Sequence, residues 1–447
     1  MKKIGALLLA LVMVFAMGTI AFAADMNGES GVIGEFTTPD EATTQTDTVV
    51  IKKEITAYNP ENCTVNAPTI TYNYTIGAAT VADGTTVTDN ASRHNKINET
   101  DVTATVSVKA GVGTPTITGT GVGVLAITPS NQLTASKYGT ANRFDLTVDF
   151  TSVDWASAGT GAGVYRYVIN ETTEATTKNA SGIDEGTTPK ELFLDVYVDG
   201  SGYIYGYVLF TTNTSIDGSA SEDTAATTAG KVEGFVDDSA GTVYSETNTS
   251  AADKYYTFNL DLKKVVVNDT YASTTHHQFP FTVTLANTSV TANVLPIMTV
   301  GDNATQTALT AAPIAGTWNP TIADGATIKY VGIPCGTTIT VCETNDVVGV
   351  TYNSVSENAD TNAGAKSINT GVASNNAIIN CGATALTAAT ENHTSTDKGV
   401  LTFTNTLLQI SPTGVVLRVA PYALMLAAGI ALFVIFAKRR KEEPEEA

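Results

Sequence analysis

Short segments in which apolar and polar residues alternate make up most of the chain between its two ends. The clearest reads ELFLDVYVDGSGYIYGYVLF over residues 191–210, with a glycine-containing turn at its centre. A period of two residues is that of a β-strand, and turns rich in Gly, Asn, Asp and Thr separate one strand from the next. Many short strands of this kind are typical of β-sandwiches, so we expect an all-β body of immunoglobulin-like sandwich domains.

The alternating segments form two unequal copies of one pattern. Each copy begins with a strand that carries two adjacent lysines and continues with an aromatic strand. A strand that ends in glutamate comes later, and an aromatic strand with an asparagine closes the copy. The segments are VVIKKEI, PTITYNYTI, AGVYRYVINETTE and YYTFNL in the first copy, and LDLKKVVV, QFPFTVTL, CGTTITVCETN and LTFTNTL in the second. We therefore expect two sandwich domains, at residues 45–257 and 258–408, after a flexible lead at residues 24–44.

Both ends of the chain carry targeting signals. Residues 1–23 combine two lysines, an apolar run and a small-x-small site that ends at Ala23, which predicts a secretory signal peptide. Residues 415–437 are mostly apolar and long enough for a transmembrane helix, and the basic residues that begin the 438–447 tail place that tail in the cytoplasm. We therefore expect the body of the protein outside the cell, attached to the membrane.

The residues before this predicted helix resemble a sorting signal. Pro412, Thr413 and Gly414, followed by an apolar segment and a basic tail, are similar to the signal of sortase substrates in Gram-positive bacteria. The usual motif is Leu-Pro-x-Thr-Gly, and its leucine and spacer are absent here. The resemblance implies that a sortase cuts after Thr413 and joins its carbonyl to an amine, on peptidoglycan or on a neighbouring subunit. A plain membrane anchor is the alternative.

Charge and composition exclude several classes of partner. The formal net charge is −20 at pH 7, and such a surface repels nucleic acid and anionic lipid. The four histidines are scattered, and the four cysteines show no metal-ligand spacing, so we predict no metal and no other cofactor. A disulfide among Cys335, Cys342 and Cys381 is compatible with the sequence, which does not give its pairing.

Three strands of the second copy each direct one polar side chain to their apolar face. Alternation predicts that Lys264, Glu343 and Asn405 are these side chains. Burial favours the neutral forms of an amine and a carboxyl group. Neutral Lys264 can then attack the side-chain carbonyl of Asn405, while Glu343 polarises that carbonyl and relays a proton to departing ammonia. The alternative is an ordinary buried ion pair between Lys264 and Glu343, with Asn405 bonded to the backbone.

The segments KKVVVND, FPFTVTL, ITVCETN and LTFTNT resemble the repeat modules of FctA-type pilin subunits of Gram-positive bacteria. The resemblance covers most of the chain after the flexible lead and is strongest from Tyr255 onward. It implies a Lys–Asn isopeptide bond, with Lys264 as the donor, Asn405 as the acceptor and Glu343 as the acid that promotes the bond. The reaction occurs once within each molecule, so we do not expect an enzyme that turns over.

The first copy offers a matching but less regular set. Lys53 lies on the apolar face of its strand, and Glu171 ends the segment GVYRYVINE, which is close to the family's strand Gly-x-Tyr-x-Tyr-x-Ile-x-Glu. Asn259 is the acceptor candidate, although it lies only five residues before Lys264. One strand would then have to serve the cores of both domains.

Together these features predict a structural surface protein anchored in the cell wall, with a pilus shaft subunit as the leading interpretation. The family's Tyr-Pro-Lys-Asn motif, which supplies the polymerisation lysine, is absent, and Lys254 is the candidate to replace it. A non-polymerising wall-anchored adhesin that binds a host glycan or protein is the alternative. Neither GxSxG nor HExxH occurs in the chain, and no pair of carboxylates stands out, which argues against a hydrolase.

Overall fold

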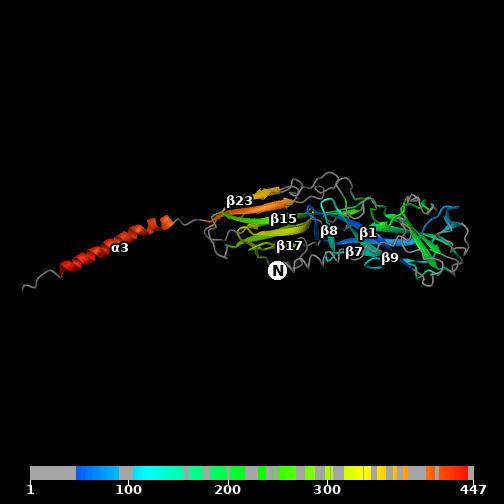
Figure 1. Ribbon diagram of the computed structural model, residues 1–447, viewed down its shortest axis with the longest axis horizontal. Coiled ribbons are helices and arrows are strands. Elements are labelled where there is room, and N and C mark those ends of the chain that lie inside the picture. Colours follow the sequence, from blue (N-terminus) through cyan, green and yellow to red (C-terminus); the bar gives the residue numbers. More distant parts are fainter. Residues whose placement is uncertain are drawn as a thin grey trace, which may run out of the picture.

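The structure is a computed structural model of the chain (Figure 1). It describes residues 47–89, 104–155, 161–174, 182–198, 202–216, 230–237, 244, 250–267, 277–286, 297–302, 304–305, 317–335, 337–343, 350–358, 366–369, 376–380, 399–407 and 412–440. Strands make up most of the described body, and the one helix among these residues is α3 Pro412–Arg440. The all-β prediction is therefore confirmed for the described body, whereas the immunoglobulin-like topology stays a prediction. The predicted signal peptide, the flexible lead and Cys381 lie outside the described residues.

Two sheets face each other in the first domain. Its strands are β1 Thr48–Tyr58, β2 Cys63–Asn66, β3 Ile70–Ala78, β4 Thr86–Asp89, β5 Ala104–Ala110, β6 Thr116–Thr118, β7 Val124–Ile127, β8 Gln132–Ala135, β9 Thr140–Asp149, β10 Gly163–Thr173, β11 Ile183–Asp184, β12 Glu191–Val198, β13 Ile204–Phe210 and β14 Gly234–Phe235. In one sheet β1 pairs with β9 in the antiparallel sense, and the opposite sheet has the order β13-β12-β10-β3-β7. Ile51 and Leu146 from the first sheet pack with Tyr167 and Leu194 from the second in a buried core. Alternating apolar residues on both sheets supply this core, as the sequence predicts.

The second domain repeats the arrangement with fewer described residues. Its strands are β15 Asp253–Val267, β16 Phe279–Ala286, β17 Ile297–Val300, β18 Ala304–Thr305, β19 Thr317–Trp318, β20 Thr321–Ile322, β21 Thr327–Pro334, β22 Thr338–Glu343, β23 Val350–Asn358, β24 Lys366–Asn369, β25 Asn376–Asn380 and β26 Gly399–Leu407. Leu262 and Phe403 from one sheet pack with Phe281 and Val341 from the other. The rings of Phe281 and Phe403 meet edge to face, with centroids 5.0 Å apart.

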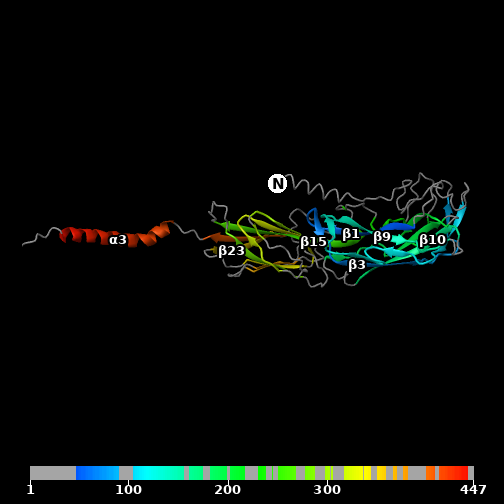
Figure 2. The same ribbon diagram turned by 90° about the horizontal axis from the view of Figure 1, so that it is seen from below.

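The strand β15 belongs to both domains. Its first residues pair in the parallel sense with the end of β1, and its later residues pair with β21 and, again in the parallel sense, with β26. The sheet order β17-β21-β15-β1-β9-β6 therefore runs from one domain into the other, and the two domains lie end to end (Figures 1 and 2). The predicted boundary between residues 257 and 258 falls inside this strand, so one strand does serve both cores.

The burial of β15 changes where it leaves the junction between the domains. Residues 255–262 are all buried, because the strand is covered on both faces there. From Lys263 onward buried and exposed side chains alternate, and Lys264 is on the buried face. At the same junction Gly332 of β21 has a φ of +81°, and a Cβ atom on it would lie 2.9 Å from the Cβ of Val65. A glycine at this position therefore allows the second domain to approach β2 of the first.

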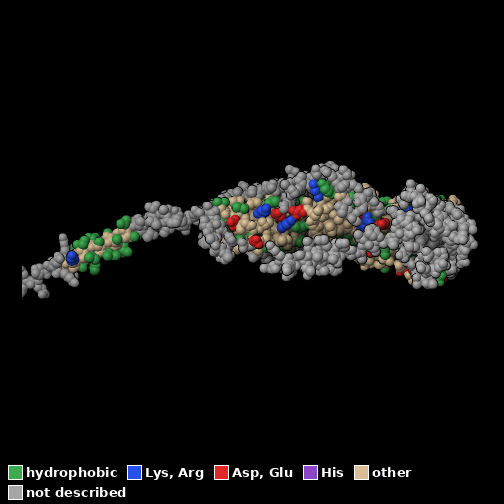
Figure 3. Space-filling view, viewed as in Figure 1, with side chains coloured by type: hydrophobic (Ala, Val, Ile, Leu, Met, Phe, Trp, Pro, Cys, Tyr) green, Lys and Arg blue, Asp and Glu red, His purple; other side chains and the backbone are tan. Residues whose placement is uncertain are grey.

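The helix α3 follows β26 and lies away from both domains (Figures 1 and 2). Its described side chains are mostly apolar and exposed, among them Leu424 and Phe433 (Figure 3). Among the described residues, no helix meets the combined length and apolar character needed to cross a membrane. The predicted transmembrane helix at residues 415–437 is therefore not confirmed. The backbone of Pro412, Thr413 and Gly414 forms the beginning of α3.

Candidate functional site

The second domain brings together the three polar side chains that the sequence analysis selected. Lys264 lies on β15 and Asn405 on the neighbouring parallel strand β26, and Glu343 ends β22 in the facing sheet. All three side chains are buried, as the alternation predicts. The strand order thus places the amine and the carboxamide on adjacent strands, with the carboxyl group opposite them.

One oxygen of Glu343 joins the three groups. The Nζ atom of Lys264 lies 3.0 Å from Glu343 Oε1, and the Nδ2 atom of Asn405 donates to the same oxygen at 2.6 Å. Lys264 Nζ also donates to the backbone oxygen of Phe403 at 3.2 Å and lies 4.4 Å from the ring centroid of Phe279. The amine is therefore held by one carboxyl group, one carbonyl and an aromatic face.

Burial shifts both ionisable groups of this site toward their neutral forms. It lowers the pKa of Lys264 to about 8, although the Glu343 carboxylate opposes that shift. It raises the pKa of Glu343, against the opposing effects of Lys264 and Asn405. Within the described residues, Glu343 Oε2 and Asn405 Oδ1 have no hydrogen-bond partner. If Glu343 carried a proton, its carboxyl group would provide a hydrogen-bond donor in a site where these two acceptor oxygens lack one.

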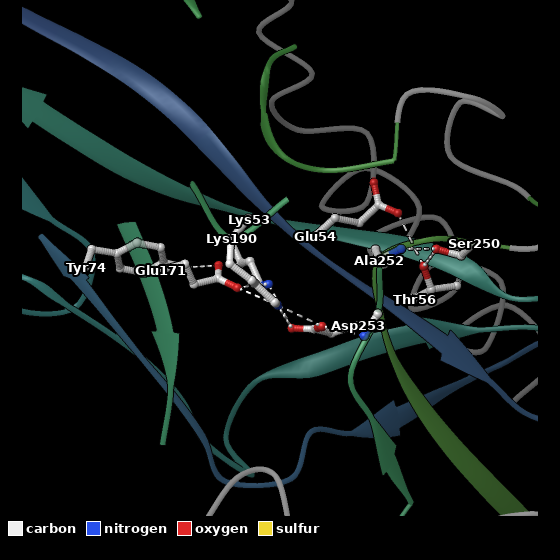
Figure 4. Close-up of polar contacts among 10 residues, drawn as sticks. Lys53, Glu54, Thr56, Tyr74, Glu171, Lys190, Ser250, Ala252 and Asp253 are labelled. Carbon is white, nitrogen blue, oxygen red and sulfur yellow. Dashed lines mark hydrogen bonds and ion pairs between the residues drawn. The ribbon is translucent and has the colours of Figure 1, made fainter. Parts of the chain in front are cut away.

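The first domain contains a different set of groups around its buried lysine (Figure 4). Lys53 Nζ lies 2.8 Å from Glu171 Oε1 and 2.8 Å from Asp253 Oδ2. A second lysine, Lys190, lies 2.7 Å from Glu171 Oε1 and 3.2 Å from Asp253 Oδ1. The hydroxyl group of Tyr74 donates to Glu171 Oε2 at 2.9 Å. The pairing of Lys53 with Glu171 follows the sequence prediction, whereas Asp253 and Lys190 were not expected there.

Opposite charges hold Asp253 and Lys190 of this site in their ionised forms. Burial would raise the pKa of Asp253, but the ammonium groups of Lys53 and Lys190 outweigh it and hold that pKa well below its usual range. Burial would lower the pKa of Lys190, but Glu171 and Asp253 outweigh it and raise that pKa. Burial also raises the pKa of Tyr74, and the Glu171 carboxylate adds to the shift, so the phenol remains a donor.

The structure does not bring Asn259 to Lys53. Asn259 lies at the junction between the domains, where its side chain and that of Asn59 donate to each other at 2.8 Å. The backbone amide of Gly332 donates to Asn259 Oδ1 at 3.1 Å. The prediction of Asn259 as the acceptor of the first domain is corrected, because β15 runs parallel to β1 and carries this residue past the end of that strand.

The remaining predicted residues lie elsewhere. Lys254 is half-buried on β15, and its backbone is paired with Thr56 on one side and Asp184 on the other. Pro412, Thr413 and Gly414 belong to α3, far along the chain from either lysine site. Among the described residues, no group of three His, Cys, Asp or Glu side chains is arranged to hold a metal ion.

Three comparisons test whether the chain resembles known proteins. The family model described as Domain of unknown function (DUF7601) matches residues 258–380. No curated protein matches the chain. Among solved structures, the chain is similar to the major pilin protein (T-13) from Streptococcus pyogenes, with 14% identity, coverage of 81% of this chain and 98% of that one, and a TM-score of 0.32.

Two further structures are similar to the chain. For the major pilin from Streptococcus pyogenes the identity is 18%, the coverage is 80% of this chain and 99% of that one, and the TM-score is 0.31. For the pilus-presented adhesin Spy0125 (Cpa) the identity is 16%, the coverage is 49% of this chain and 37% of that one, and the TM-score is 0.22. At TM-scores of this size, similarity alone does not establish a shared function.

Proposed function

We propose that the protein is a structural subunit of a surface fibre, with a pilus shaft as the leading case, and that its second domain forms an amide between Lys264 and Asn405. The observation that carries this proposal is the shared contact of both side chains with Glu343 Oε1, in a site where all three side chains are buried. Holding two reactants together and away from water lowers the activation barrier of their reaction, by about 7–11 kcal/mol in favourable cases.

The step balances without any other reactant. Lys264 transfers one proton to Glu343, and its neutral Nζ forms a bond to Cγ of Asn405. The bond between that Cγ and Nδ2 breaks, and ammonia leaves with the second proton of the amine, which Glu343 relays. Glu343 keeps the first proton, so no unpaired charge remains in the core.

A bond at this place ties the first strand of the domain to the last. Backbone hydrogen bonds join the parallel strands β15 and β26 along their length, and the amide would add a covalent link between them. The amide also closes a long loop and so restricts the unfolded chain. Both effects suit a subunit that serves as a mechanical element.

Intact-mass spectrometry of the secreted protein tests the bond. The wild-type chain should weigh less than its sequence mass by one ammonia from this site, and Glu343→Gln should retain that ammonia because it removes the proton relay. Lys263→Ala is the matched control, because Lys263 is the adjacent lysine on the exposed face of β15. A wild-type mass that retains this ammonia would contradict the proposal.

Attachment to other molecules is the second part of the proposal. The sequence Pro412-Thr413-Gly414 supports cleavage by a sortase after Thr413, and the half-buried Lys254 is the candidate amine on the next subunit. Cell walls from the producing bacterium should show a ladder of high-mass species, which Thr413→Ala abolishes and Lys254→Ala reduces to single subunits. A single wall-linked band in the wild type would favour the non-polymerising adhesin instead.

A further inference from the structure

The two domains place different residues at one equivalent position. In the second domain Val266, two residues beyond Lys264, is paired with Asn405 across two parallel strands. In the first domain Ile55, two residues beyond Lys53, is paired with Asp253, again across two parallel strands. Relative to its lysine, Asp253 therefore occupies the position of Asn405.

Asp253 also meets Lys53 directly. The Lys53 Nζ atom lies 2.8 Å from Asp253 Oδ2, with no exposed area on the lysine side chain and 3% on that of the aspartate. We propose that Lys53 and Asp253 condense to an amide with loss of water, and that Lys190 is the counter-ion of Glu171 before and after this reaction. The inference rests on the proposed function, because it uses the same kind of chemistry, but it names another acceptor, another leaving group and an additional residue.

The condensation balances within the residues of the site. One proton of Lys53 passes to the carboxylate of Asp253, which gives a neutral amine and a carboxylic acid. Nζ forms a bond to Cγ of Asp253, and the bond between Cγ and one carboxyl oxygen breaks. That oxygen leaves as water with a second proton of the amine, relayed by Glu171, which lies 2.8 Å from Nζ. Glu171 has the same charge at the end as at the start.

Lys190 makes the charges balance when the acceptor is an acid. Its Nζ atom contacts Glu171 more closely than Asp253, at 2.7 Å against 3.2 and 3.4 Å. Before the reaction two ammonium groups face two carboxylates, and afterwards Lys190 and Glu171 remain as one pair. Without Lys190 the product would leave the Glu171 charge buried with no cation, which is costly. Asn405 carries no charge, and the second domain reaches a neutral product without a second lysine.

The other groups around the site do not change this balance of charges. Tyr72 and Tyr74 of β3 face it, and their pKa values are raised by burial and by the carboxylates, so both phenols are neutral. The ammonium group of Lys53 also lies 4.2 Å from the ring centroid of Tyr72. Gly186 donates its backbone amide to Asp253 Oδ1 at 2.8 Å, which holds the acceptor in place.

The first test is the intact mass of the full secreted chain. The wild type should lose one ammonia from the second domain and one water from the first. Asp253→Asn changes the leaving group to ammonia but gives the same final amide, so its reacted mass should equal that of the reacted wild type. Asp253→Ala should retain the water and still lose the ammonia. A wild type that loses ammonia alone overturns this inference and leaves the proposed function standing, whereas loss of water alone does the reverse.

The second test addresses Lys190 through the pH dependence of the reaction. Unfolded chains are refolded for a fixed time at a series of pH values between about 6 and about 8. They are then denatured, and their intact masses are measured. Loss of water should be independent of pH in the wild type, because no proton is taken up. In Lys190→Met the site must bind a proton, so the yield should fall with rising pH by up to about tenfold per unit.

Two controls keep this second test decisive. Lys190→Arg retains the cation and should keep the profile flat, and the loss of ammonia from the second domain reports refolding in the same spectra. If Lys190→Met gives the wild-type yield at every pH, Lys190 is not the required counter-ion. If Lys190→Arg shows the pH dependence of Lys190→Met, the effect is one of shape and the inference about charge is wrong.

Discussion

The two domains bury a lysine at the same place in the same strand arrangement but surround it with different charges. Lys264 meets one carboxyl group and a carboxamide, and burial brings its pKa down to about 8. Lys53 meets two carboxylates that it shares with Lys190, and the pKa of Asp253 lies well below its usual range because those two cations outweigh burial. The difference shows that the strands fix where the groups meet, while the residue across from each lysine (Asp253 or Asn405) and its neighbours influence their protonation.

Among changes that test this difference between the domains, Lys264→Met should lower the unfolding free energy the most. It removes the only cation that contacts Glu343 among the described residues, and it removes the donor of the proposed amide. In an Asn405→Ala chain, which forms no amide, the change breaks the buried pair between Lys264 and Glu343 and should cost about 3–5 kcal/mol. In the reacted wild type it instead removes the long closed loop, which contributes about 2–5 kcal/mol. Denaturant unfolding followed through Trp318, which lies in the second core, measures the loss. Lys263→Met, on the exposed face, should change the unfolding free energy by less than about 0.5 kcal/mol.

A smaller effect is expected from the equivalent change in the first domain, Lys53→Met. Lys190 remains in contact with both carboxylates there, so one cation still faces the two buried charges, whereas Lys264→Met leaves Glu343 with none among the described residues. Loss of the lysine charge should therefore lower the unfolding free energy by roughly 3 kcal/mol, the lower end of the range for breaking a buried pair. Loss of the closed loop of the first domain adds a separate contribution. Trp155, which lies in the first core, reports this unfolding. If Lys53→Met costs more than Lys264→Met, Lys190 does not compensate the carboxylates.

The charge state of Lys264 should be visible in the pH dependence of a chain that cannot form the amide. In Asn405→Ala the folded pKa of Lys264 lies below the unfolded value, so between about pH 8 and about pH 10 the unfolded chain binds the proton and the folded chain does not. The second domain should therefore gain stability as the pH rises through this window, by up to about 3 kcal/mol. Adding Lys264→Met should remove the gain, and a gain that persists would assign it to another group.

The smallest effect concerns a partner that only the first domain has. Tyr74→Phe removes the hydrogen bond to Glu171 Oε2, while the corresponding Glu343 Oε2 has no partner among the described residues. A hydrogen bond to a charged group contributes about 1.5–3 kcal/mol, so the first domain should lose an amount in that range. Unfolding followed through Trp155 measures it. No change would mean that water replaces the phenol, or that the Glu171 carboxyl group does not carry its charge.

The faces of the strands could be predicted from the sequence because alternation of apolar residues is a local property. Lys53, Lys264, Glu171, Glu343 and Asn405 are buried where the pattern predicts. The proposed acceptor of the first domain, Asp253, could not be predicted in the same way, because its position depends on the register between β1 and β15, which are about 200 residues apart in the chain. A motif with asparagine favoured Asn259, and an aspartate at the start of a strand gave no comparable signal. Lys190 was missed for the same reason, since it lies just outside β12.

The continuity of β15 has a consequence for how far the molecule can be stretched. Asp253 and Lys264 are eleven positions apart on this one strand, so the acceptor of the first proposed amide is followed directly by the donor of the second. With both amides present, a pull on the two ends would pass through Lys53, across to Asp253, along β15 to Lys264, and across to Asn405. The backbone between the two links is already an extended strand of roughly 36 Å, at about 3.3 Å per residue. Every loop of both domains would then be excluded from the contour length, and the molecule would be almost inextensible.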